Sequence, residues 1–294
     1  MTPTPPLYGR RTALGLLTAA AATPAAAPVL AQTPMPPGPW DKEGNIATSA
    51  GTLHWVSVGE GDPLVLLHKL GGWVADWRHI APLLAKNRRI IAIDLPAHGA
   101  SKMWGPAPYM MTVPEIMTQL LAAIDEMGLT QFHIGGNSLG GLAGAAIAAL
   151  FPDRIKTVTL VSASLIGQIS RKDIAQQDID RRGQGLSDGV LGTDIFGTMV
   201  PQVTEEMIAS RAAVGPWLRP IERGVGWSNI NAYLPRIQCK MLLINTDRGN
   251  YTKYEAVGKR LIPHLTSVII PNSGSFVHQE RPAETAAIIN KFLP

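Results

Sequence analysis

Ser138 lies between glycines at the junction of an apolar run and a segment rich in Ala and Leu. Residues 136–140 fit the pattern G-x-S-x-G, in which a sharp turn between a strand and a helix exposes the serine hydroxyl. The apolar residues 132–134 predict a buried strand and residues 142–150 predict a helix, as this turn requires. An incidental glycine-rich turn is the alternative, but the flanking elements favour a nucleophilic serine.

The elements that must position this serine alternate between short apolar stretches and amphipathic ones. Buried strands that alternate with amphipathic helices predict a mostly parallel sheet with helices on both faces. Residues 164–235 break the pattern after the sixth strand and are rich in polar residues, Gly and Pro. We expect them to form a helical cap over the carboxyl ends of the strands, where open α/β sheets bind ligands. The other strands are expected at 52–58, 64–67, 90–93, 158–161, 241–244 and 267–270, and the other helices at 77–85, 113–127, 254–261 and 283–292.

The composition excludes several classes of protein. With 294 residues, 46% of them hydrophobic and 16% charged, the chain is long and apolar enough for one large α/β domain. Its net charge of +4 forms no basic stripe with interleaved aromatic residues, so no nucleic-acid partner is expected. No cluster of His, Cys and Asp has the spacing of metal ligands, and no glycine-rich phosphate loop follows the first strand. We therefore expect neither a metal nor a cofactor.

The first 31 residues differ from the rest of the chain. Arg10 and Arg11 precede an apolar, Ala-rich stretch at 13–22, and residues 29–31 fit a signal-peptidase site. This arrangement predicts a signal peptide at 1–31, which is too short and too interrupted by proline to span a membrane stably.

The signal peptide predicts export to the periplasm or secretion. Adjacent arginines indicate the twin-arginine route. Ala13 stands where that motif prefers a large apolar residue, so the Sec route stays open. A Pro-rich linker is expected to follow at 32–45.

Four motifs along the chain together resemble those of one superfamily. In chain order they are His68 with Gly71, Gly72 and Trp77, for H-G-x7-W; residues 94–101, for D-x-P-G-x-G-x-S; the turn at Ser138; and residues 274–282, for G-H-F-V-H-x-E-x-P. From about residue 46 to 294 the chain therefore resembles the α/β-hydrolase superfamily. The resemblance implies an eight-stranded, mostly parallel sheet built from 46–163 and 236–294, with the cap at 164–235 inserted after strand 6.

The resemblance also implies a reaction, the hydrolysis of an ester, thioester, lactone, amide or related acyl compound through an acyl-serine. The partner would be a small-molecule acyl substrate. Ser138 would be the nucleophile, activated by a histidine that a carboxylate orients. The backbone N–H groups of Leu139 and Leu70 would donate to the oxyanion.

For the acid and the base, the resemblance indicates the loops after the last two strands. Asp247 is the only carboxylate of the first loop, and His278 is the only histidine in the second connection. With Ser138 they follow the family's order of nucleophile, acid and histidine. Alternatively, Asp247 caps the next helix or pairs with Arg248. In many relatives a second histidine at the place of His278 packs structurally at the start of the last helix.

Several positions depart from the family's pattern. Lys69 replaces the glycine that follows the motif histidine, and Ala97 replaces the glycine of the turn after the fourth strand. The alignment of the last motif puts Ser275 in the place of the catalytic histidine. A serine cannot act as a general base near neutral pH.

Three accounts of these departures remain open. A shifted loop brings His278 to the serine, or Lys69 acts as the base after desolvation lowers its pKa. In the third account the chain is a catalytically impaired homologue that binds a ligand. The interpretation we favour is an exported serine hydrolase of a small ester, lactone or related acyl compound. The alternatives are the ligand-binding homologue and a cofactor-free lyase or perhydrolase on the same fold.

Overall fold

The computed structural model describes residues 34–186, 197, 200–262 and 264–294, so the predicted signal peptide at 1–31 lies outside the described residues. The described strands form one sheet. They are β1 Lys42–Ala47, β2 Gly51–Val58, β3 Asp62–Leu67, β4 Arg88–Ile93, β5 Lys102–Met103, β6 Phe132–Asn137, β7 Ile155–Val161, β8 Lys240–Thr246 and β9 Leu265–Ile270.

The sheet follows the order β1-β2-β4-β3-β6-β7-β8-β9, with the short β5 paired beside β2. From β4 to β9 all neighbours are parallel, whereas β2 is antiparallel to β1 and to β4. This confirms the predicted mostly parallel sheet: eight strands form its continuous path, and β5 is the ninth.

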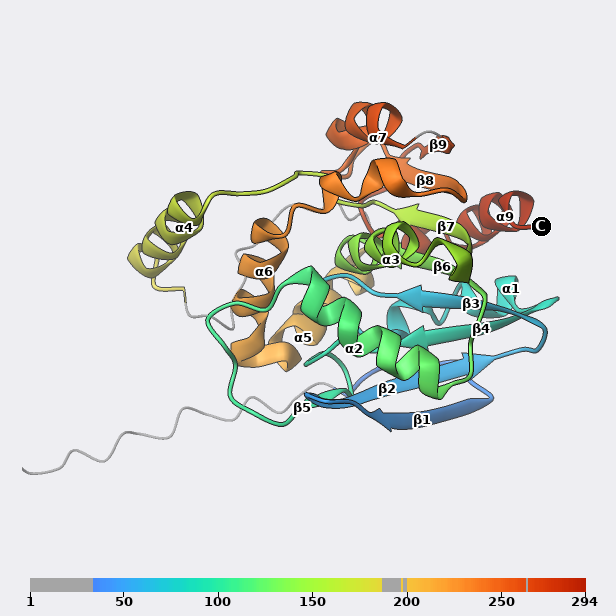
Figure 1. Cartoon of the computed structure of the whole chain (residues 1–294), viewed down its shortest axis with the longest axis horizontal. Coiled ribbons are helices and arrows are strands. Elements are labelled where there is room, and N and C mark those ends of the chain that lie inside the picture. Colours follow the sequence, from blue (N-terminus) through green and yellow to red (C-terminus); the bar gives the residue numbers. More distant parts are fainter. Residues whose placement is uncertain (1–33, 187–196, 198–199, 263) are drawn as a thin grey trace, which may run out of the picture. The chain divides into compact units, whose positions relative to one another are not determined.

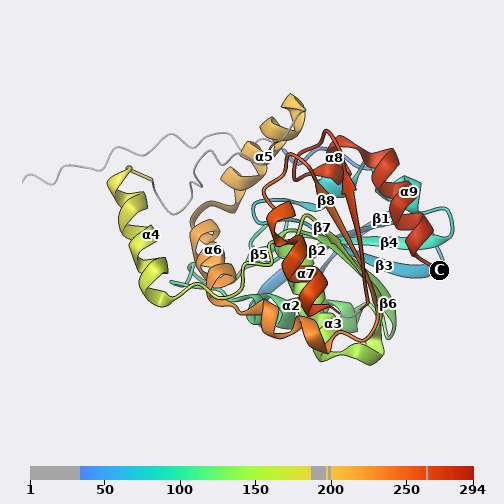
Figure 2. The ribbon, with the colours of Figure 1, turned by 90° about the horizontal axis from the view of Figure 1, so that it is seen from above.

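Helices cover both faces of the sheet, and the central strands are apolar along their length for that reason. Along β3, Val65 and Leu67 point to the core under the helices at Val113–Glu126 and Leu139–Leu150. Leu64 and Leu66 point to the core under the helices at Ala81–Leu84 and Pro282–Phe292. Figure 2 shows these two helical layers on opposite sides of the strands. The helices are α1 Ala81–Leu84, α2 Val113–Glu126, α3 Leu139–Leu150, α4 Arg171–Gly183, α5 Pro201–Val214, α6 Leu218–Trp227, α7 Glu255–Leu261, α8 Val277–Glu280 and α9 Pro282–Phe292, with 3-10 turns η1 Val74–Trp77, η2 Pro152–Arg154, η3 Gly215–Trp217, η4 Ile230–Ala232, η5 Leu234–Arg236 and η6 Thr252–Tyr254.

Helices α4, α5 and α6 lie between β7 and β8 in the chain, within the segment predicted to be a cap. Figure 1 places them beyond the carboxyl ends of the central parallel strands. Glu206 on α5 accepts two hydrogen bonds from Arg78, at 2.9 and 2.6 Å, and the Ser210 hydroxyl donates to the Gly71 carbonyl at 2.7 Å. These contacts hold α5 against the loop that follows β3. Residues 187–196 and 198–199 of the predicted cap lie outside the described residues.

Three local predictions differ from the structure. The predicted helix at 77–85 is the turn η1 followed by the four-residue α1, because Pro82 lies in the first turn of α1, where a helix begins more readily than it continues. The predicted linker at 32–45 is wrong in extent, since β1 begins within it. This strand is largely exposed and lacks an apolar run, so only its pairing with β2 forms it. Within the predicted helical cap, the sequence indicated no separate helix at the place of α6.

Among the helices of the described part of the chain, none combines the length and the apolar character that crossing a membrane requires.

Candidate active site

Ser138 stands between the last residue of β6 and the first residue of α3, in a backbone conformation with φ +48° and ψ −112°. Non-glycine residues rarely adopt positive φ, so this is a strained position of the kind found at functional sites. The glycines on either side are required by space. A Cβ at Gly136 would collide with the backbone of Gly140, and a Cβ at Gly140 would collide with the Leu67 carbonyl. The predicted strand, turn and helix around Ser138 are confirmed.

Hydrogen bonds fix this turn to its neighbours in the sheet. The Ser138 N–H donates to the Val161 carbonyl at 3.2 Å, and the Asn137 side chain donates to the same oxygen at 2.8 Å. The Gly140 N–H donates to the His68 carbonyl at 3.1 Å, which joins the start of α3 to the loop after β3. Backbone hydrogen bonds therefore hold the predicted nucleophile and the predicted oxyanion loop together.

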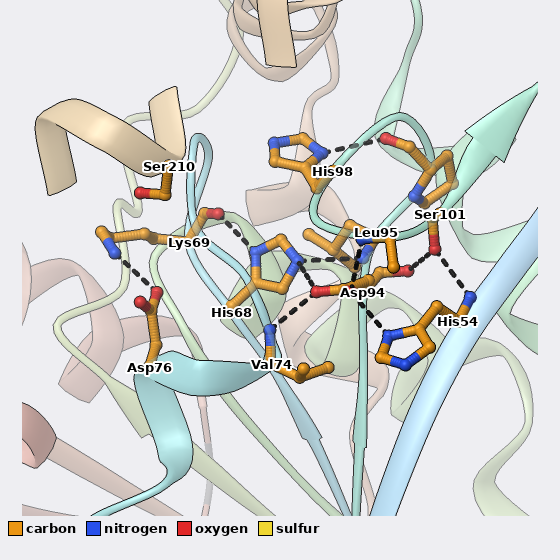
Figure 3. A network of polar contacts seen from close by, with 12 residues as sticks. His54, His68, Lys69, Val74, Asp76, Asp94, Leu95, His98, Ser101 and Ser210 are labelled. Atoms are coloured by element: carbon orange, nitrogen blue, oxygen red, sulfur yellow. Dashed lines mark hydrogen bonds and ion pairs between the residues drawn. The ribbon is translucent and has the colours of Figure 1, made fainter. Parts of the chain in front are cut away.

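His68 is a structural residue of that loop. Its Nδ1 donates to the Lys69 carbonyl at 2.7 Å, and its Nε2 accepts from the Leu95 N–H at 2.9 Å, so the ring is neutral (Figure 3). Burial, with a contribution from the nearby His98, lowers the pKa of His68 well below its usual value.

His98 makes the reciprocal connection from the turn after β4. Its Nδ1 donates to the Pro96 carbonyl at 2.9 Å, and its Nε2 accepts from the Gly71 N–H at 2.9 Å. Burial lowers the pKa of His98 to about 4. Two neutral histidines therefore fasten the oxyanion loop to the neighbouring turn.

Asp94 is the acceptor at the centre of the same network. It receives the Val74 N–H at 2.7 Å, the Ala100 N–H at 2.9 Å and the His54 ring at 2.8 Å (Figure 3). This is the role of a turn residue. The turn also contains Ala97 at φ +65°, a conformation that a glycine would adopt without strain.

Lys69 forms a buried ion pair with Asp76, with 2.5 Å between Nζ and Oδ2 (Figure 3). The ammonium also lies 4.7 Å from the centre of the Phe276 ring. Burial lowers the pKa of Lys69 and raises the pKa of Asp76, while the charge of each partner opposes the shift in the other. The lysine that replaces the family's glycine is thus accommodated by a carboxylate seven residues further on.

A cavity of about 240 Å³ lies over Ser138. The structure brings together at this cavity the predicted nucleophile Ser138 and the two predicted oxyanion residues, Leu70 and Leu139. Helices α5 and α6 contribute to its wall. The residues that line it are Lys69, Leu70, Ser138, Leu139, Ser164, Arg211, Glu222, Val225, Asn250, Tyr251, Lys253, Tyr254 and Phe276.

The Ser138 hydroxyl makes a hydrogen bond of 3.1 Å to the hydroxyl of Tyr251. Tyr251 lies four residues after Asp247, in the loop in which the sequence predicted the acid. Sequence reasoning missed it because the motifs and departures of the family pointed to a carboxylate, a histidine or a lysine and not to a tyrosine. Its only signal is its position in that loop.

The structure does not bring the predicted base to the serine. His278 lies on α8, completely buried, with its ring 4.3 Å from the ring of Trp77. Among the described residues, neither ring nitrogen has a hydrogen-bond partner. Burial, with the charge of Lys69, lowers the pKa of His278 well below its usual value. Because α8 begins at Val277, the backbone turns this histidine toward η1. Its position corresponds to that of the second histidine of many relatives, which packs structurally at the start of the last helix.

The predicted acid is also apart from the serine. Asp247 is exposed and accepts a hydrogen bond from the Ser273 N–H at 3.3 Å. Hydrogen bonds from the backbone of Asn272 and Ser273 lower the pKa of its carboxyl. Asp247 therefore stabilises the turn after β9 and is not hydrogen-bonded to His278, whose ring nitrogens have no partner in the part of the chain that the structure describes.

Ser275, in the place of the family's histidine, connects two loops. Its hydroxyl accepts from the Asn250 N–H at 3.2 Å, and its carbonyl accepts from the Asn137 side chain at 3.3 Å. The buried serine thereby ties the loop after β8 to the loop after β9 and to the turn at Ser138.

Comparison with known proteins agrees with this architecture. Residues 62–205 match a family model described as alpha/beta hydrolase fold. The chain is 35% identical over 118 residues to the dihydrolipoyllysine-residue acetyltransferase component of an acetoin cleaving system from Pseudomonas putida, a match that covers 40% of this chain and 31% of that protein. It is 23% identical over 266 residues to (E)-2-((N-methylformamido)methylene)succinate hydrolase from Acinetobacter baylyi, covering 82% of this chain and 94% of the relative.

Among solved structures, the enol-lactonase from Burkholderia xenovorans is similar with a TM-score of 0.71 and 20% identity, over 85% of this chain and 99% of that one. At this identity the similarity concerns the fold. The chain belongs to the α/β-hydrolase superfamily. The chain spans about a third of the length of the Pseudomonas putida relative. Its similarity to hydrolases supports a hydrolase activity.

Proposed function

We propose that this protein is a serine hydrolase that cleaves a small ester, lactone or related acyl compound through an acyl intermediate on Ser138. The observation that carries the proposal is the strained turn at Ser138, which places the serine in the wall of a 240 Å³ cavity together with Leu70 and Leu139. Strain of this kind is retained where function requires it.

Attack of the Ser138 oxygen on an acyl carbon would generate an oxyanion. The N–H of Leu139 at the start of α3 and the N–H of Leu70 are the proposed donors to it. Fixed donors stabilise the developing charge without reorganisation, and the loss of one typically lowers kcat by about 10²–10³. The histidine contacts at Lys69 and Gly71, on either side of Leu70, would keep its N–H in place.

The size of the cavity supports a small substrate, since sites for drug-sized ligands have about 300–1,000 Å³. The similarity over 82% of this chain to (E)-2-((N-methylformamido)methylene)succinate hydrolase supports a hydrolase of small molecules. We also propose that the protein is exported, which the sequence of residues 1–31 supports. Sequencing the N-terminus of the mature protein tests this, because cleavage after Ala31 would leave Gln32 first.

The second candidate is the ligand-binding homologue without efficient turnover. Two observations favour it. The His278 ring is buried away from Ser138, and Ser275 stands where the family has its catalytic histidine, so no histidine is placed at the Ser138 hydroxyl by either position.

Intact-mass spectrometry after treatment with a fluorophosphonate separates the two candidates. A stoichiometric adduct that is absent from Ser138→Ala is the result expected of a hydrolase. Without an adduct at any pH between 6 and about 9.5, a range that spans histidine and much of the tyrosine titration, Ser138 is not activated and the binding protein becomes the better interpretation.

A further inference from the structure

We propose that Tyr251 is the general base of this hydrolase and accepts the proton of Ser138 in place of a histidine. This inference rests on the proposed function. It starts from the 3.1 Å hydrogen bond between the Tyr251 and Ser138 hydroxyls. A group that takes a proton from a nucleophile must lie within about 2.6–3.2 Å of it, and tyrosine is among the side chains that act as general bases.

The loop that carries Tyr251 is held in position on both sides. The hydroxyl of Thr252, the next residue, donates to the Thr246 carbonyl at the end of β8. The N–H of Asn250, the preceding residue, donates to the Ser275 hydroxyl at 3.2 Å. Ser275 is the residue in the place of the family's histidine. Its hydroxyl therefore helps to fix the loop from which Tyr251 reaches the nucleophile.

The other titratable groups at the cavity are less suitable as bases. Of the described residues, those that line the cavity include no histidine. Lys69 donates to Asp76 at 2.5 Å, and Glu222 accepts from Arg219 at 2.7 Å, so both side chains are engaged in ion pairs. Tyr251 is the group for which the structure gives a direct contact to the Ser138 hydroxyl.

The charges around the cavity favour a negatively charged phenolate. The Lys69 ammonium on the loop after β3 is balanced by Asp76, and further cations come from two other elements, with Arg211 on α5 and Lys253 on η6. Glu222 on α6 is the acidic side chain in the same wall. An excess of positive charge stabilises an anion in a site partly shielded from water.

The proposed step conserves atoms and charge. The Tyr251 phenolate takes the proton of the Ser138 hydroxyl while the serine oxygen bonds to the acyl carbon, and the carbonyl electron pair moves to oxygen. When the carbonyl re-forms, the bond to the leaving oxygen breaks, and the Tyr251 hydroxyl returns the proton to that oxygen. Water then repeats the sequence in place of the serine and releases the acid.

The test measures how fast a fluorophosphonate labels Ser138 as a function of pH, by intact mass. Labelling forms the serine O–P bond and expels fluoride, so it requires the same proton transfer and no known substrate. A phenol with an ordinary pKa of about 10 predicts a rate that rises about tenfold per pH unit between pH 7 and 9. An imidazole base would reach its plateau near pH 7.5, about one unit above its ordinary pKa.

Tyr251→Phe removes one hydroxyl and should slow labelling by about 10²–10⁴ at pH 9, the usual contribution of a general base. The matched control is Tyr254→Phe, which also removes a phenol from the cavity wall, and it should retain the rise with pH. Incorporation of a fluorinated tyrosine at position 251 provides a second test without loss of the hydroxyl. Because its phenol is more acidic, the rise in rate should move to lower pH.

The outcomes separate the two proposals. A Tyr251→Phe protein that labels as fast as the parent overturns the role of Tyr251 and leaves the serine hydrolase intact. A parent profile that is flat above pH 7.5 does the same. If Tyr251→Phe does not fold, the fluorotyrosine protein decides, and an unshifted profile overturns the proposal. A parent that is not labelled at any pH overturns the proposed function itself.

Discussion

Acidification should weaken the attachment of the oxyanion loop through His98. In the folded protein this ring is neutral, with Nε2 accepting the Gly71 N–H and Nδ1 donating to the Pro96 carbonyl. Protonation of Nε2 would turn it into a donor that faces the Gly71 N–H, which is also a donor, so this hydrogen bond would be lost. It would also place a charge in a fully buried position. The folded state therefore binds this proton less readily than the unfolded chain does.

The magnitude follows from the two pKa values of His98, 6.5 in the unfolded chain and about 4 in the fold. Because the folded value is depressed, the unfolded state binds more protons between them, and stability is lost as the pH falls through this window. At 1.36 kcal/mol for each pKa unit, His98 alone should lower the free energy of unfolding by about 2.5 kcal/mol between pH 7 and 4.5. His68 shifts in the same direction and adds to the loss.

Urea unfolding followed by tryptophan fluorescence at pH 7 and 4.5 measures this loss, and His98→Gln is the comparison. Glutamine can accept from Gly71 and donate to Pro96, but it does not titrate. The difference in unfolding free energy between the two pH values should be about 2.5 kcal/mol smaller in the variant. An equal loss in both proteins would refute the assignment of the acid sensitivity to His98.

Three further results are expected from substitutions near the site. Ala97→Gly should stabilise the fold by about 1 kcal/mol and raise Tm by about 2–4 °C, because φ +65° strains alanine; a lower Tm in calorimetry would contradict this. Lys69→Met should cost roughly 3–5 kcal/mol by leaving Asp76 charged and buried, and adding Asp76→Leu should recover most of that loss in urea unfolding. An equally unstable double variant would show that the ion pair is not the cause. His278→Leu should retain labelling of Ser138 and gain about 1 kcal/mol in stability, since both nitrogens are buried without partners; abolished labelling would identify His278 as the base after all.

Several features of the fold could be predicted because they depend on local patterns. The strands around the core are nearly continuous apolar runs, and a run that is buried on both faces has this composition wherever it lies in the sheet. The turn at Ser138 was predictable for the same reason. Gly136 is required by its contact with Gly140, four residues away, so this part of the requirement is local, whereas Gly140 is required by its contact with Leu67 in β3.

Strand β1 shows where local pattern is insufficient. Its residues alternate between exposed and half-buried positions and include Gly44 and Asn45, so they have little preference for a strand. The backbone partner in β2 forms the strand. The residues that pair with a strand lie elsewhere in the sequence, across a turn or further away. An exposed edge strand has no apolar pattern from which its pairing could be predicted.

The sequence alone determined the class of fold and the turn between strand and helix at Ser138, with the loop residues Leu70 and Leu139 beside it. The tertiary structure decided which side chain meets the serine hydroxyl. Asp247 and His278 had the right residue types in the right order, yet a one-turn helix at α8 directs the histidine onto Trp77, and backbone donors hold the aspartate at the surface. The partner of Ser138 is Tyr251, which comes from a loop 113 residues away. Such contacts depend on how several loops close together over the sheet, and no residue type or spacing within one segment encodes that.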